Sequence, residues 1–171
     1  MTASRKIITA SQAAPARLEP GWFYIPKLSP FERPIPIPVA MSRFVARFRA
    51  EYYGGSDQAR RLDLSVFGDV ADHVHVLARD RKRNSWTFDR FAPSYASRIG
   101  TDLTGADIRD ARFAPYNLRL DMKLERLLGE RKPIYVPTRI EELGGERISH
   151  RLLIPLSIDR SSISHCLLMI V

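Results

Sequence analysis

The C-terminal stretch "RISHRLLIPLSIDRSSISHCLLMIV" (147–171) contains two apolar runs separated by the polar segment "DRSS" (159–162). The segment before it, "PIYVPTRIEEL" (133–143), has a similar pattern and is joined to it through Gly144 and Gly145. Two glycines between alternating runs are typical of a β-hairpin, and the polar break predicts a second tight turn. The sequence therefore predicts three consecutive antiparallel strands, and this prediction decides the fold.

Two further strands and two helices are predicted upstream of these strands. The runs "HVHVLARD" (73–80) and "SWTFDRF" (85–91) are rich in β-branched and aromatic residues, which favour strands. A short helical piece, "SYASRIG" (94–100), follows them, and "APYNLRLDMKLERLLGER" (114–131) is the clearest helical segment. The predicted apolar side of this long helix comprises Tyr116, Leu120, Leu124, Leu127 and Leu128.

An amphipathic helix is predicted over "AMSRFVARFRAEYYGG" (40–55), with Ser42 as its N-cap. Its apolar stripe comprises Phe44, Val45, Phe48 and Tyr52. Such a stripe can dock on a sheet or pair with its copy in a second chain, and we expect Phe44, Phe48 and Tyr52 to form a dimer or partner contact. A short helix or turn is predicted next, within "LDLSVFGDVADH" (62–73).

The first forty residues have the composition of an extended arm. Seven of the twelve prolines lie between Pro15 and Pro38, and such a density of proline excludes helices and central strands. The aromatic residues Trp22 and Phe23 are too apolar for a solvated tail. We therefore expect the arm to lie against its own core or against a second subunit.

The segment "SRIGTDLTGADI" (97–108) holds two glycines five residues apart. A phosphate-binding P-loop needs Lys and Ser or Thr directly after its last glycine. Gly105 is instead followed by Ala106 and Asp107, and a carboxylate at this position repels phosphate. We expect the segment to reverse the chain, because Gly, Asp and Thr are common turn residues.

The composition is that of one ordinary globular domain with an extension. Of 171 residues, 44% are hydrophobic and 27% are charged. No apolar run is long enough to cross a bilayer, and residues 1–20 lack the apolar region of a secretory signal. The single cysteine, Cys166, excludes an internal disulfide. We therefore expect a cytoplasmic protein without a membrane partner.

The net charge of +8 leaves a nucleic-acid partner open as an alternative. Residues 1–65 hold ten basic and five acidic side chains, so most of the surplus lies outside the predicted core. No recognition helix is evident. The alternative is a basic adaptor that binds nucleic acid or an anionic nucleotide through Arg79, Arg81, Lys82 and Arg83, which surround the turn between the first two strands.

Catalytic and metal-binding patterns are weak, and we expect the protein not to be an enzyme. Cys166 adjoins His165, but neighbouring residues of a strand point to opposite faces. His73 and His75 share a face but lack a third ligand nearby. His150 is at least four residues from His165 along the predicted strands, roughly 13 Å, so these two cannot share an ion. A single histidine could line a pocket or bind haem, but a structural role is favoured. No metal is predicted, and the sequence does not identify a cofactor.

The order of these elements resembles a PAS domain, and two motifs resemble a bacterial subfamily of small stand-alone PAS proteins. These motifs are "GTDLTG" (100–105) and "RLLIPLS" (151–157), and the lead-in segment 48–80 is also similar. The resemblance covers residues 44–171. Two features depart from the pattern: "YYGG" lacks the expected tryptophan, and the Pro-rich arm has no counterpart.

The resemblance implies an α+β fold with a five-stranded antiparallel sheet and helices on one face. The PAS-like domain would span residues 66–171, after a Pro-rich arm (1–40) and an amphipathic helix with a linker (41–65). A sensory or signalling module that binds a small ligand, a protein partner or both is the implied function. The chain given ends at Val171 without an output domain, so we expect any signal to pass by contact with another protein.

The expected ligand space lies between the sheet and the helices. Occupancy of this space would favour one arrangement of the sheet and the N-terminal helix, and so bias a dimer or partner contact. The residues expected to line it are Tyr95, Phe113, Tyr116, Leu120, Leu124, His150, Leu152 and His165.

Overall fold

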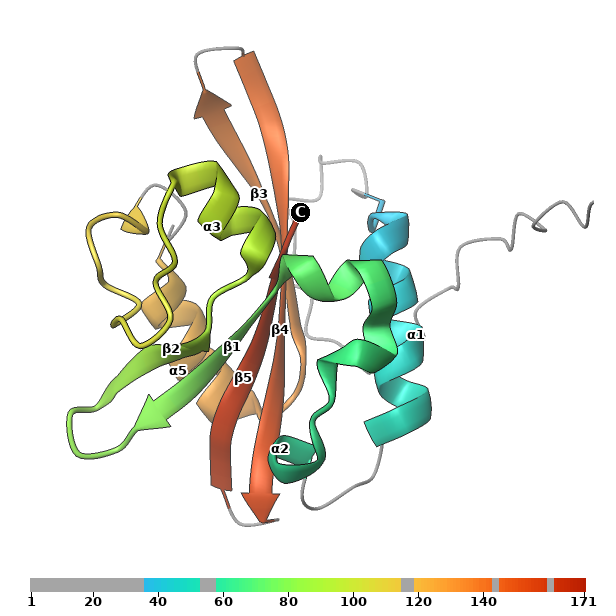
Figure 1. Cartoon of the computed structure of the whole chain (residues 1–171), viewed down its shortest axis with the longest axis vertical. Coiled ribbons are helices and arrows are strands. Elements are labelled where there is room, and N and C mark those ends of the chain that lie inside the picture. The colour runs from blue at the N-terminus through green and yellow to red at the C-terminus, as the bar shows by residue number, and fades with distance from the viewer. Residues whose placement is uncertain (1–35, 53–57, 115–118, 143–144, 160–161) are drawn as a thin grey trace, which may run out of the picture.

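The computed structural model describes residues 36–52, 58–114, 119–142, 145–159 and 162–171. Its centre is a five-stranded antiparallel sheet with the strand order β2-β1-β5-β4-β3 (Figure 1). The strands are β1 (Val74–Asp80), β2 (Ser85–Arg90), β3 (Ile134–Glu142), β4 (Gly145–Asp159) and β5 (Ser162–Ile170). The predicted α+β fold and its five antiparallel strands are therefore confirmed.

Helices surround this sheet. They are α1 (Val39–Tyr52), α2 (Gln58–Arg61), α3 (Pro93–Ile99) and α5 (Leu120–Glu130), together with the 3-10 segment η1 (Leu64–His73). Among the described residues, none of these helices is long and apolar enough to span a bilayer.

The C-terminal strands form the middle of the sheet and one edge. β4 pairs with β3 along the whole of β3 and with β5 on its other side. β5 also pairs with β1, so that Val74 lies opposite Met169. A central strand is covered on both faces, which explains why "CLLMI" (166–170) is apolar at every position and fully buried.

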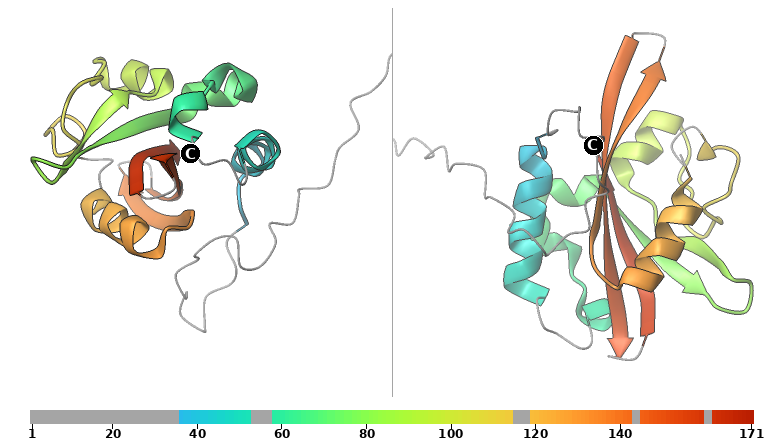
Figure 2. Two further views of the ribbon diagram at one scale, coloured as in Figure 1. Left: turned by 90° about the horizontal axis from the view of Figure 1, so that it is seen from below. Right: turned by 180° about the vertical axis from the view of Figure 1, so that it is seen from behind.

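Helices cover both faces of the sheet. One face carries α3 and α5, and the other carries α1 and η1 (Figure 2). Alternate strand residues serve the two cores: Leu153 and Leu168 belong to the first core, and Leu152 and Leu167 belong to the second. The one-faced helical layer implied by the resemblance is thus extended by α1, which docks on the opposite face.

Helix α1 begins three residues before the predicted N-cap. Ser42 lies inside the helix, is buried, and donates its backbone N–H to the carbonyl of Pro38 at 3.0 Å. The prediction of a Ser42 cap was wrong because the helix has already begun: the bond from Ser42 to Pro38 is a helical i→i−4 bond, which places Ser42 inside the first turn. Gly54 and Gly55, which were expected to stop this helix, lie outside the described residues.

Helix α5 is shorter at its start than the predicted segment 114–131. It begins at Leu120 because Arg119 has a left-handed backbone, with φ of 60°. It ends at Glu130, and Arg131 (φ 55°) donates its N–H to the carbonyl of Leu127 at 2.9 Å. Tyr116 lies outside the described residues.

The predicted Pro-rich arm, residues 1–40, lies almost wholly outside the described residues. At its described end, Ile37 and Ala40 pack against the core between α1 and the sheet. The prediction that the arm contacts its own core or a second subunit is not tested beyond these two residues.

Candidate functional site

The residues expected to line one ligand space are divided between the two faces of the sheet. Tyr95, Phe113, Leu120 and Leu124 belong to the core under α3 and α5. Leu152 belongs to the core under α1, and His150 and His165 are on the same side as Leu152. Tyr116 is not described. A single space lined by the whole set is therefore excluded.

Strand alternation explains this division. His150 and Leu152 share one face of β4, and His165 lies opposite Leu156, which packs under α1. The residues of β4 that point toward α3 and α5 are instead Arg151 and Leu153. His150 is half-buried, and its Nδ1 atom lies 2.7 Å from the hydroxyl of Tyr135.

The interior under α3 is filled by a cluster of aromatic side chains around His75. The sequence had not indicated that His75 lies in this space. His75 is fully buried, and the centroids of four aromatic rings lie 4.7–5.7 Å from its own. These rings belong to Phe88, Phe91, Tyr95 and Phe113. The space that had been predicted for a ligand is thus occupied by side chains that contact one another.

Hydrogen bonding fixes the protonation state of His75. Its Nδ1 accepts the backbone N–H of Ala92 at 3.0 Å, so the ring proton resides on Nε2. Burial, helped by the positive charge of Arg90, lowers the pKa of His75 to about 3. Nε2 has no hydrogen-bond partner among the described residues. The imidazole therefore stays neutral at physiological pH and serves as part of the core.

A groove of about 280 Å³ lies between α5 and the edge strand β3. Its apolar wall is made by Met122, Ile134 and Val136, and its charged rim by three cations. These cations are Arg119, Lys123 and Arg126. A cavity with an apolar wall and charges of one sign is suited to a ligand that is apolar and negatively charged.

A further cation, Arg151 on β4, is buried next to this groove. This arginine is 1% exposed, and burial lowers its pKa to about 10. Burial and the nearby Arg151 together lower the pKa of Lys123 to about 8, against the opposing effect of Asp121. Two basic side chains, Lys123 and the buried Arg151, thus lie close enough at this end of the groove for Arg151 to lower the pKa of Lys123.

A wider groove of about 720 Å³ lies between α1 and η1. Arg43 and Arg47 line it on α1, and Asp69 lines it on η1. Because both signs of charge are present, the lining does not favour one class of ligand.

The stripe of α1 that was expected to contact a second chain is buried inside this one. Phe44, Phe48 and Tyr52 are 1%, 3% and 4% exposed. The ring of Phe44 lies 4.5 Å from that of Phe67, centroid to centroid, and Tyr52 Oη accepts the N–H of Asp63 at 2.8 Å. These side chains are not available for a dimer contact, since the sheet and η1 already cover them.

The "GTDLTG" turn closes the outer edge of β2. Gly105 (φ 86°) donates its N–H to the carbonyl of Phe88, and the N–H of Phe88 is donated to the carbonyl of Ala106 at 2.9 Å. Thr104 Oγ1 accepts the N–H of Phe91 at 3.1 Å and donates to Asp102 at 2.7 Å. The turn thus satisfies the open backbone groups of an edge strand.

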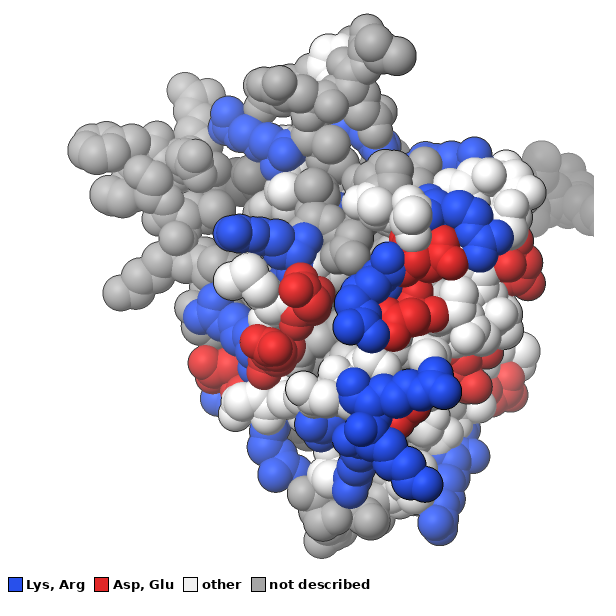
Figure 3. Space-filling view, turned by 90° about the vertical axis from the view of Figure 1, so that its left-hand side faces the viewer, with Lys and Arg blue, Asp and Glu red and all other residues white. Residues whose placement is uncertain are grey.

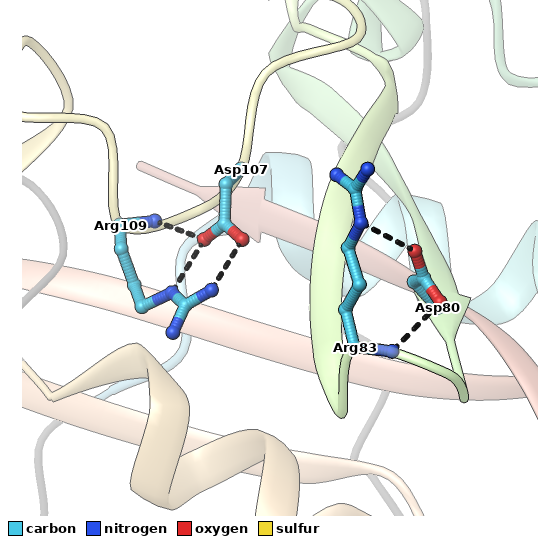
Figure 4. Close-up of polar contacts among 4 residues, drawn as sticks. All are labelled: Asp80, Arg83, Asp107 and Arg109. Carbon is cyan, nitrogen blue, oxygen red and sulfur yellow. Dashed lines mark hydrogen bonds and ion pairs between the residues drawn. The ribbon is translucent and has the colours of Figure 1, made fainter.

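Ion pairs mix the charges on the side of the molecule that carries β2 and α3. Basic and acidic side chains intermingle there (Figure 3). Arg109 makes a two-pronged contact with Asp107, with a shortest separation of 2.7 Å (Figure 4). At the tip of the β1–β2 hairpin, Arg83 lies 3.7 Å from Asp80, and Arg81 donates to Ser162. Lys82 is exposed beside them, so the predicted basic cluster is partly neutralised.

The histidines do not assemble a metal site. His73 ends η1 and is exposed, whereas His75 is buried, so the two do not share a face. His165 pairs with Leu156, which places it about 20 Å from His150 along β4. Among the residues that the structure describes, no group of three His, Cys, Asp or Glu side chains could hold an ion.

No protein-family model matches the chain, and no curated protein is significantly similar to it.

Proposed function

We propose that this protein is a PAS-like sensory or signalling module that binds a small molecule and passes its state to another protein by contact. The observation that supports the proposal is the two-sided sheet. A ligand groove lies on one side of it, and the N-terminal helix α1 packs on the other.

Strand β3 can link these two sides. Ile134 and Val136 form the wall of the groove, and Tyr135, between them, belongs to the core under α1. A ligand seated on Ile134 and Val136 displaces β3, and the displacement moves Tyr135 against α1. Tightly packed cores respond to such shifts by changing arrangement rather than by deforming gradually. Ligand binding would therefore favour one position of α1.

We propose a cytoplasmic protein that binds its ligand without a catalytic step. Burial raises the pKa of the Cys166 thiol well above its usual range, which makes it a poor nucleophile. The low pKa of His75, about 3, likewise makes it a weak base. Both side chains are buried apolar-core residues, and a signalling role requires neither to react.

A homodimer remains part of the proposal, but its interface has to be sought elsewhere than on the buried stripe of α1. The signalling partner and the second chain would both bind surfaces that move when α1 changes its position. The end of α1 at Val39, which is 58% exposed, is one such surface.

Native mass spectrometry of the freshly purified full chain tests this proposal. We expect the mass of the chain plus a small molecule, which is lost on denaturation, or uptake of one from a protein-free bacterial metabolite filtrate. The same spectrum gives the number of chains in the assembly. A bare chain mass under both conditions would contradict the sensory function.

The alternative function, a basic adaptor, rests on the exposed hairpin tip near Lys82. Binding to nucleic acid weakens steeply as salt concentration rises, because counterions compete for phosphate. Titration of a labelled oligonucleotide at low and at physiological salt would detect such binding, and a steep salt dependence would favour the adaptor.

A further inference from the structure

The charged residues of α5, and Arg119 directly before it, line two different cavities. Lys123 and Arg126 on α5 line the groove against β3, together with Arg119. Asp121 and Glu125, four residues apart, line a different cavity, which also contains Trp86. Two of the three acidic residues of α5, Asp121 and Glu125, thus line a different cavity from the three cations, although Asp121 still acts on Lys123 through space. The charged residues that line the groove are therefore all basic, whereas the helix as a whole carries both signs.

Two further features, a buried arginine and the dipole of α5, add positive potential at the groove. Arg151 on β4 is buried and acts on Lys123 through space. The groove also lies along the first turns of α5, where the helix dipole is positive. A negatively charged group at Lys123 is therefore stabilised from the helix, from β4 and from the rim.

The opposite part of the groove is apolar. Ile134 is 1% exposed and Val136 is half-buried, whereas Met122 on α5 is 53% exposed. An exposed methionine beside a small cavity is an adaptable surface for an apolar ligand. A purely inorganic anion would leave this surface in contact with water.

From these observations we infer that the groove between α5 and β3 binds a small amphipathic carboxylate, with its carboxylate at Arg119, Lys123 and Arg126 and its hydrocarbon part on Met122, Ile134 and Val136. This inference names the ligand class of the proposed sensory module and therefore rests on that function. The guanidinium groups offer paired N–H donors to a carboxylate, and the ammonium adds a compact charge.

The experiment uses octanoate as the probe and two partial mimics as comparisons. Octan-1-ol keeps the hydrocarbon chain without the charge, and inorganic phosphate keeps the charge without the chain. Binding is followed by ¹H–¹⁵N NMR titration of the full-length protein, which reports both the affinity and the position of the bound probe. We expect saturable octanoate shifts at residues 119–126 and 134–136, with each mimic binding at least tenfold more weakly.

Two variants separate the roles of the charged and apolar sides. Lys123→Gln removes the central cation and should weaken octanoate binding roughly tenfold or more, as loss of a charged hydrogen bond does. Lys82→Gln is the matched control on the exposed hairpin tip and should leave the affinity unchanged. Val136→Thr makes the apolar wall polar at nearly constant shape, and should weaken octanoate but not phosphate. Well-dispersed spectra of all three variants verify that they are folded.

The pH dependence gives an independent readout. Lys123 is faced by Arg151 from β4 and by Arg119 and Asp121 from its own helix, and its pKa is lowered to about 8. Octanoate affinity should therefore fall as the pH rises from 7 to 9, because Lys123 loses its charge. The same pH change should have little effect on Lys123→Gln.

Three results would overturn the inference: octanoate shifts that map outside the groove, equal binding of octanol, and unchanged affinity in Lys123→Gln. Each of these rejects the carboxylate site while leaving the sensory function open, since native mass spectrometry can still reveal another small molecule. Conversely, the NMR titration could place octanoate in the groove while native mass spectrometry finds no cellular small molecule on the protein. This pair of results would support the carboxylate site and count against the sensory function.

Discussion

At the scale of single residues, His75 shows how a titratable side chain becomes a core residue. Its Nδ1 satisfies the N–H of Ala92, which lies just before α3 and has no exposed surface. Four aromatic rings surround the imidazole, so the neutral form is favoured strongly over the charged one. His75 therefore couples the position of α3 to β1 and makes stability depend on pH.

This dependence can be measured by comparing the wild type with His75→Phe in urea denaturation. The pKa of His75 is about 3 in the folded protein and about 6.5 when unfolded, so the unfolded chain binds one more proton between these values. Stability contributed by neutral His75 is complete above pH 6.5 and is lost as the pH falls toward 3. Between pH 6.5 and 5 the wild type should lose about 2 kcal/mol more than the variant.

The carboxyl groups titrate in both proteins, so the difference between the two slopes isolates His75. At pH 7 the variant should be less stable by about 1–3 kcal/mol, because Ala92 N–H loses its acceptor. Parallel slopes for the two proteins would show that His75 is solvated or charged in the folded state.

Residue-level reasoning from sequence failed at β4 for a physical reason. A buried arginine is rare, so Arg151 between His150 and Leu152 makes the odd-numbered positions appear to face water. His150 and Leu152 were expected to line the space under α3 and α5, whereas their face of β4 packs under α1. The alternation itself was predictable from the sequence. Its direction was not, because both faces of β4 are buried, one under α1 and the other under α3 and α5, so local hydropathy does not distinguish them.

At the scale of elements, the docking of α1 follows from its aromatic stripe. Phe44 is 1% exposed and packs on Phe67 of η1. Phe44→Ala should lower the free energy of unfolding by roughly 3–5 kcal/mol, since it leaves a cavity between α1 and the sheet. Urea denaturation followed by circular dichroism measures the change.

Arg43→Ala is the matched control on the same helix, because Arg43 is exposed beside the groove. It should change stability by no more than about 0.5 kcal/mol. If Phe44→Ala instead altered the number of chains in the assembly and left stability intact, the stripe would be a dimer contact after all.

The "GTDLTG" turn makes a second prediction at this scale. Thr104→Val removes the acceptor of Phe91 N–H and the donor to Asp102. We expect a loss of about 1 kcal/mol or more in unfolding free energy, with octanoate affinity unchanged, since the turn lies on β2 and not at the groove. Thr101→Val serves as the control. The hydrogen bond from Thr101 to the carbonyl of Ala96 is made by its backbone N–H, so the substitution retains this bond. Altered octanoate affinity in Thr104→Val would contradict a purely structural turn.

Most elements could be predicted from sequence because their patterns are local. The Gly-Gly hairpin, the β1 and β2 runs and the amphipathic helix α1 all appear within a few residues of their predicted positions. The start of α5 could not be predicted, since a left-handed Arg119 has no local sequence signature. The groove was also missed: its cations are visible on α5, but the wall provided by β3 depends on tertiary packing.

At the scale of the whole molecule, the sheet separates two layers that carry different functions in the proposal. Helix α5 lies on one side of the sheet and α1 on the other (Figure 2), and the groove between α5 and β3 is on the side of α5. Charge is mixed over the side that carries β2 and α3 (Figure 3), whereas the charged residues that line the groove are all basic. The distribution supports selective binding at one place over general attraction to polyanions.

The central claim is that occupancy of the groove reaches α1 through β3. Hydrogen exchange of the full-length protein with and without saturating octanoate tests it directly, with peptides resolved by mass spectrometry. We expect slower exchange in α5 and β3 together with a changed exchange rate in α1 (Val39–Tyr52), and neither change in Lys123→Gln at the same octanoate concentration. Protection confined to α5 and β3, with α1 exchanging as in the free protein, would contradict it.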